Sequence, residues 1–165
     1  MKTLYKRILT ILLTITLIPA FACDCENAGD FLVVAKKTPV VLVVKVKQYS
    51  TFKLIQNKRT PISMEVDVIK ILKGAETRST IKIWGDDGKL CRVFLTQFRM
   101  NQTMVVALQN GNPKSGLWGE KHSDYFISDC GQYWCVADLK TKNAIVGTGQ
   151  NMEQMSFDEV SERVR

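Results

Sequence analysis

The chain has 165 residues, a formal net charge of +7 and five cysteines. This length suits one domain with its own core and gives no reason to propose two. The modest positive charge permits weak attraction to anionic polysaccharide, lipid or acidic protein. Nucleic acid is not expected as a partner, because the first 22 residues have the pattern of an export signal.

The first 22 residues have the layout of a secretory signal peptide. Three basic residues precede an apolar run at 8–18, and a small-x-small cleavage site follows at 20–22. The run is shorter than the roughly 20 residues that span a bilayer. We therefore expect a leader at 1–22 and a mature chain at 23–165 that is secreted, periplasmic or held at the cell surface. The leader has no acidic residue, so the mature charge is 7 − 3 = +4.

All five cysteines follow the expected cleavage site, at Cys23, Cys25, Cys91, Cys130 and Cys135. They belong to a compartment in which disulfides form and persist. Because five is an odd number, one thiol must be free, intermolecular or chemically modified. The sequence alone does not choose among the pairings.

The first half of the mature chain predicts one helix and two strands. A short helix is expected at 31–37, ended by Pro39. Residues 40–48 (VVLVVKVKQ) are β-branched and begin to alternate with lysines, as in a strand with one wet face. The alternation at 62–72 shifts phase near Ile69, which predicts a bulge or a strong bend. Residues 49–60 are expected to extend a strand or form a hairpin loop.

The second half predicts further short strands and a closing helix. In chain order these are strands at 80–84, 104–108, 125–128 and 133–139, a surface loop at 110–119, and a helix through 164 after the capping box at 156–159. Short, bent, mostly antiparallel strands predict a mainly β fold, a small closed β-barrel with short flanking helices, because closure removes exposed edges.

The order of these features resembles the netrin-like OB-fold domain. This resemblance depends on a Cys-x-Cys after the leader and on the segments VVLVVKVKQ, VDVIKILKG, IKIWG, KLCRVF, MVVAL and YFISDCG. Within that class the chain is most similar to the inhibitory domain of tissue inhibitors of metalloproteinases (TIMPs) and their shorter bacterial relatives. The resemblance spans about 23–130. It implies a single disulfide-stapled OB-fold domain at 23–165 with disulfides Cys23–Cys91 and Cys25–Cys130, and it has no counterpart for Cys135.

The resemblance also implies a TIMP-like metalloendopeptidase inhibitor. A catalytic zinc with three protein ligands keeps one position open. In the family, the α-amino and carbonyl groups of the first cysteine chelate that zinc, and the next side chain enters the specificity pocket. These roles fall to Cys23 and Asp24. The family usually has a small hydroxyl or apolar residue at the second position, so Asp24 argues against inhibition of ordinary matrix metalloproteinases.

Lipidation of Cys23 is an alternative. Ala20 and Phe21 fit the lipoprotein signal poorly, but consuming Cys23 would leave four cysteines, which could pair as Cys25–Cys91 and Cys130–Cys135. A blocked amine would abolish chelation. The chain would then be a lipid-anchored or extracellular interaction module without protease inhibition, and membrane contact is expected only in this case.

Catalysis, a resident metal and a cofactor are not expected. A Cys135, His122 and Asp124 arrangement is formally available, but His122 is the only histidine and falls in a polar segment. The partner is therefore expected to be a zinc metalloproteinase or another envelope or extracellular protein.

Seven aromatic residues could form a stacking platform or fill the barrel, and we favour the second interpretation. They are Trp84, Phe94, Phe98, Trp118, Tyr125, Tyr133 and Trp134. Trp118, in a glycine-rich loop, is the best candidate for ligand contact.

Overall fold

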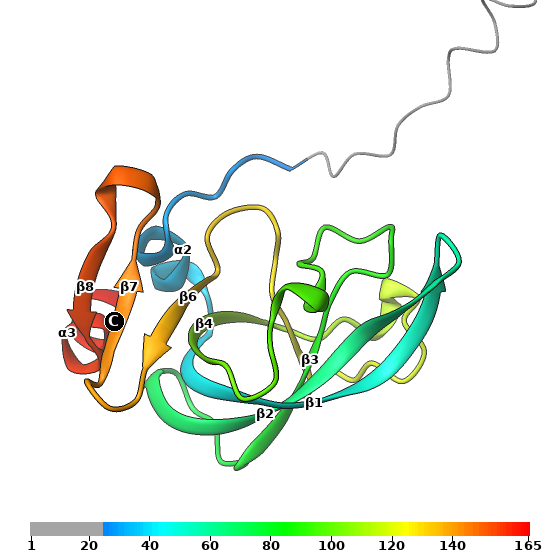
Figure 1. Ribbon diagram of the computed structural model, residues 1–165, viewed down its shortest axis with the longest axis horizontal. Coiled ribbons are helices and arrows are strands. Elements are labelled where there is room, and N and C mark those ends of the chain that lie inside the picture. Colours follow the sequence, from blue (N-terminus) through cyan, green and yellow to red (C-terminus); the bar gives the residue numbers. More distant parts are fainter. Residues whose placement is uncertain (1–24) are drawn as a thin grey trace, which may run out of the picture.

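The computed structural model of the protein describes residues 25–165, and five of its strands close into a barrel (Figure 1). They are β1 (Val40–Ile55), β2 (Lys58–Lys73), β3 (Thr80–Trp84), β4 (Thr103–Asn110) and β5 (Tyr125–Phe126). The neighbour order is β1-β2-β3-β5-β4, and a β1–β4 pairing closes the ring. Only the β3–β5 pair in this ring is parallel. The predicted mainly β, closed barrel is confirmed, and its topology is compatible with an OB-fold.

The apolar half of β1 is the centre of the sheet. It pairs with β2 on one edge and β4 on the other, and each residue of 40–44 is buried. Two helices, α2 (Phe31–Lys37) and α3 (Phe157–Val164), pack apolar side chains into the same core. A strand covered on both faces needs a continuous apolar run, which explains VVLVV.

The predicted irregularity near Ile69 is a β-bulge. Val43 pairs with Lys70 while Val44 pairs with Val68, so Ile69 has no partner across the ladder. Bulges bend a strand and increase its twist, which helps a long hairpin curl into a barrel.

The basic segment after β1's buried half continues the strand and ends in a two-residue turn. Gln56 and Asn57 have φ values of 48° and 62°, the left-handed pair of a type I′ hairpin turn. The outer part of β1 and β2 projects beyond the barrel as an arm (Figure 1).

Beyond the barrel, β4 also pairs with a meander of β6 (Trp134–Asp138), β7 (Asn143–Val146) and β8 (Glu153–Ser156). The last two strands were not predicted. The closing helix α3 is confirmed, because Ser156 Oγ accepts a hydrogen bond from Glu159 N at 3.2 Å. Three short 3₁₀ helices, η1 (Leu95–Gln97), η2 (Pro113–Ser115) and η3 (Gly149–Asn151), complete the secondary structure of the described residues.

Candidate functional site: the N-terminal staple

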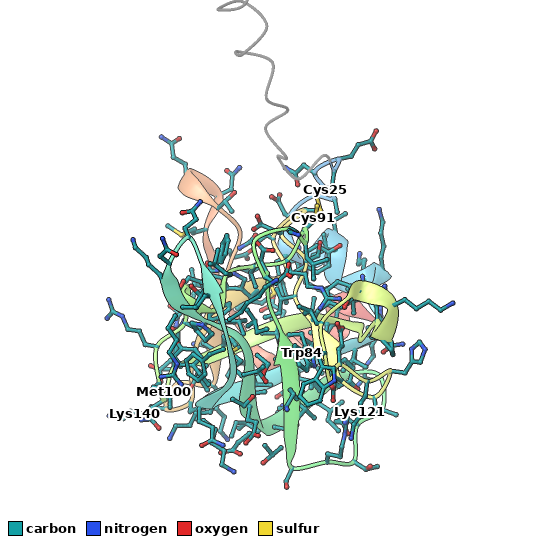
Figure 2. The ribbon with its side chains drawn as sticks, turned by 90° about the vertical axis from the view of Figure 1, so that its right-hand side faces the viewer. Cys25, Trp84, Cys91, Met100, Lys121 and Lys140 are labelled. Carbon is teal, nitrogen blue, oxygen red and sulfur yellow. A yellow bond between two sulfur atoms is a disulfide. The ribbon has the colours of Figure 1, made fainter. Side chains whose placement is uncertain are left out.

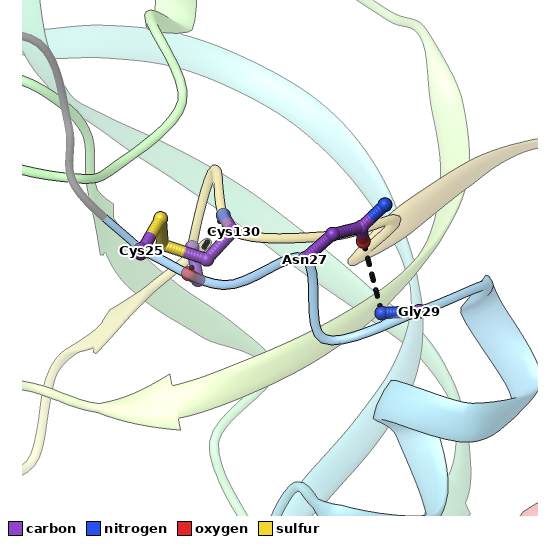
Figure 3. Close-up of a disulfide and its surroundings, with 5 residues drawn as sticks. Cys25, Asn27, Gly29 and Cys130 are labelled. Carbon is purple, nitrogen blue, oxygen red and sulfur yellow. Dashed lines mark hydrogen bonds between the residues drawn. A yellow bond between two sulfur atoms is a disulfide. The ribbon is translucent and has the colours of Figure 1, made fainter.

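The segment before α2 is fastened to the barrel by a disulfide between Cys25 and Cys130. The two Cα atoms lie 5.8 Å apart and 105 residues apart in sequence (Figure 3). Two backbone hydrogen bonds reinforce the bond: Ala28 N donates to Cys130 O at 2.7 Å, and Gln132 N donates to Gly29 O at 3.0 Å. The segment therefore lies against the loop between β5 and β6 like a short additional strand.

Two local features allow this close approach. Asn27 Oδ1 accepts a hydrogen bond from Gly29 N at 3.0 Å, which turns the chain toward α2 (Figure 3). Gly131 has a φ of 147°, and a Cβ there would lie 3.1 Å from Gly29 O. A larger residue at Gly131 would push the two segments apart. Sequence reasoning missed the roles of Asn27 and Gly131 in this approach, although the glycine directly after Cys130 was a visible signal.

Cys91 belongs to the same cluster of sulfur atoms. The Sγ atoms of Cys25, Cys91 and Cys130 all lie within 4.8 Å of one another, and Figure 2 shows Cys25 and Cys91 side by side. Cys91 is not a free thiol, because it is itself disulfide-bonded. Its implied partner, Cys23, lies outside the described residues. Metal binding needs thiolates, and the Cys25–Cys130 disulfide removes two of them, so we do not assign a metal to this cluster.

A wide groove of 520 Å³ opens beside the staple. Its walls are polar and carry two acidic side chains, Asp30 and Asp129. Partial burial, and to a lesser degree the charge of Asp86, raise the pKa of Asp129 above its ordinary value. The groove offers hydrogen-bonding groups next to the start of the described chain.

The structure corrects one alternative drawn from the sequence. Because Cys25 bonds to Cys130, the pairing Cys25–Cys91 with Cys130–Cys135 is wrong. Cys135 is a buried free thiol on β6, and burial raises its pKa to about 12. The predicted contact residues Cys23 and Asp24, like the expected signal peptide at 1–22, lie outside the described residues, so their roles stay predictions.

The other candidate residues have structural surroundings. Asp124 Oδ2 accepts hydrogen bonds from Trp84 Nε1 at 2.8 Å and Lys121 N at 3.0 Å, while His122 is exposed. A thiol with a pKa near 12 carries little thiolate at neutral pH, so Cys135 is a poor nucleophile.

Most of the aromatic residues fill the interior, as expected. Four are buried (Trp84, Phe98, Tyr125 and Tyr133), and Trp134 packs against the core. Phe94 is 45% exposed and Trp118 is 94% exposed.

No protein-family model matches this chain, and no curated protein matches it either. Among residues 25–165, no helix is long and apolar enough to cross a membrane. The fold and the staple together define a disulfide-stapled β-barrel compatible with an OB-fold.

Proposed function

We propose that this chain is an exported, non-enzymatic protein that binds a zinc metalloproteinase through the segment beginning at Cys23. The supporting observation is the disulfide between Cys25 and Cys130, which ties the chain to the barrel two residues after Cys23. An extended chain advances at most about 3.6 Å per residue, so the distance from Cys25 back to Cys23 is at most ~7 Å. Such a short tether lowers the entropic cost of placing chelating atoms on a metal.

The chemistry requires a free N-terminus. An α-amino group has an unperturbed pKa of about 8, so an appreciable neutral fraction exists near pH 7. The neutral amine and the carbonyl oxygen of Cys23 would together displace the water from a catalytic zinc and chelate the metal, which would expand from four to five ligands.

Asp24 defines the kind of protease that fits. A carboxylate in an apolar pocket costs several kcal/mol unless it is paired. The target therefore carries a basic or hydrogen-bonding group in its specificity pocket. Replacing Asp24 by Ser should shift inhibition toward metalloproteinases with apolar pockets.

The lipid-anchored interaction module is the second candidate, and the structure weakens one argument for it. That argument needed the four cysteines other than Cys23 to pair among themselves, whereas Cys135 is a buried free thiol. Intact mass and N-terminal sequencing of the protein from its native host, under non-reducing conditions, distinguish a free Cys23 from an acylated one.

The decisive experiment compares two recombinant forms against a broad panel of zinc metalloproteinases. One begins at an authentic Cys23, and the other carries one extra N-terminal Ala. We expect the first to inhibit at least one protease and the second to lose inhibition, because the added residue removes the amine from the zinc. Absence of inhibition by both forms, or equal inhibition by both, would exclude chelation by Cys23.

A further inference from the structure

The loop between β4 and β5, residues 111–124, is closed at its base. Gly111 N donates a hydrogen bond to Asp124 O at 2.6 Å, joining the two ends of the loop. A Cβ on Gly111 would lie 2.1 Å from Lys121 O, so only glycine fits there. The segment is a compact Ω-type loop held at its neck.

A buried carboxylate organises the interior of the loop. Glu120 accepts hydrogen bonds from Asn112 N at 2.8 Å and from Ser115 Oγ at 2.5 Å. It also forms an ion pair with Arg92 Nη1 at 3.1 Å, and both side chains are almost completely buried. Leu117 is buried in a small apolar cluster with Ile62 and Trp84. Polar and apolar contacts thus fix the loop on both sides of its tip.

Trp118 forms that tip. At 94% exposure it is the most exposed large apolar side chain in the described part of the chain, directly beside the buried Leu117. Gly116 and Gly119 flank it with φ values of 88° and 90°, and a Cβ on either would meet no atom within 4 Å. The glycines are needed for the backbone turn and not for space, because the positions on either side of Leu117 and Trp118 are open.

The exposed charges of the loop all have one sign. Its two acidic residues, Glu120 and Asp124, are buried and hydrogen-bonded. Its lysines, Lys114 and Lys121, are exposed. Trp118 is therefore presented to solvent with basic groups in the same loop and no exposed carboxylate among them.

We propose that Trp118, with Lys114 and Lys121, binds an anionic lipid surface. Tryptophan prefers the boundary between headgroups and acyl chains, where its ring is apolar and its N–H stays wet. The exposed lysines of the same loop are attracted to acidic headgroups. A side chain that is 94% exposed is not enclosed by a pocket and suits a flat, deformable surface, whereas small-ligand sites are concave. The rigid frame lowers the ordering cost of insertion.

This contact is independent of Cys23 and of protease binding. Figure 2 shows Lys121 at the opposite end of the molecule from Cys25, so the staple and the loop can be altered separately. The sequence had suggested membrane contact only through an acylated Cys23; the loop provides a route for the unmodified chain.

The test uses the mature chain from Cys23 and vesicles of phosphatidylcholine, alone or mixed with phosphatidylglycerol. Co-sedimentation measures the partition coefficient, and quenching by brominated lipids reports on tryptophan depth. We expect binding only to the anionic vesicles. Trp118→Ala should lower the partition coefficient by about tenfold or more, and each of Lys114→Gln and Lys121→Gln by about fivefold.

Two matched variants control for general loss of surface groups. Leu54→Ala removes an apolar side chain that is 72% exposed on the β1–β2 arm, and Lys140→Gln removes an exposed lysine from the β6–β7 turn. Both should bind as the parent does. Unchanged melting temperatures show that all the variants remain folded.

The proposal is overturned if neither vesicle type binds, if binding does not depend on anionic lipid, or if Trp118→Ala binds as well as the parent. Protection of Trp118 from a soluble quencher by an anionic polysaccharide, with no protection by vesicles, would also overturn it and identify a saccharide surface instead.

Discussion

Removing the Cys25–Cys130 disulfide should destabilise the protein substantially. The cross-link joins residues 105 positions apart and so closes a loop that contains most of the domain. In the chain-entropy model, a cross-link that closes a loop of about 100 residues lowers the conformational entropy of the unfolded chain. This stabilises the folded state by about 4.7 kcal/mol. Measured losses are often smaller, and backbone bonds such as Ala28 N to Cys130 O can persist, so we expect about 2–5 kcal/mol for Cys25→Ser/Cys130→Ser.

The assay is urea and thermal unfolding under non-reducing conditions. For a domain of this size, each kcal/mol shifts the melting temperature by about 3–4 °C, so the expected decrease is roughly 6–20 °C. Cys135→Ala is the matched control, because it removes a buried thiol and leaves the disulfide intact. Its loss should be near 1 kcal/mol, the cost of a small cavity.

A double variant within about 0.5 kcal/mol of the parent would refute the reasoning, provided thiol titration shows that the parent disulfide is formed. Such a result would mean that the unfolded chain is not constrained by the cross-link.

Three further predictions concern buried charges and the free thiol. Glu120→Ala should cost about 3–5 kcal/mol in urea unfolding, because it leaves Arg92 buried without its partner, whereas an unchanged stability would show that water reaches Arg92. Hydrogen bonds from Arg78 lower the pKa of Glu76 to about 2, so this carboxylate contributes stability that is complete above about pH 4.5 and is lost as the pH falls toward 2. In Glu76→Gln the melting temperature should therefore fall less between pH 5 and pH 2 than it does in the parent. An equal fall of the melting temperature in both proteins would contradict this role. Cys135 should resist alkylation at pH 8 in the folded protein and react after denaturation; rapid labelling of the native state would show that β6 opens easily.

Local sequence signals predicted much of the barrel. The buried half of β1, the bulge at Ile69 and the cap of α3 at Ser156 each depend on neighbouring residues, through an apolar run, a change of phase and a capping side chain. The strands β7 and β8 escaped prediction, because each has four residues and is stabilised by cross-strand pairing and by the helices beneath it.

The candidate site was also predicted only in part. The cysteines and their order are sequence facts, and the resemblance supplied a pairing of which Cys25–Cys130 is confirmed. The roles of Cys23 and Asp24 remain predictions.

The sequence by itself determined an odd number of cysteines, a short-stranded β fold and an aromatic residue set in a glycine-rich loop. Only the tertiary structure decided that Cys135 is the buried free thiol, that Glu120 meets Arg92 beneath the loop, and that Trp118 points to solvent. The physical reason is that burial and ion pairing are set by segments far apart in the chain, whereas turns, caps and alternation are set within a few residues.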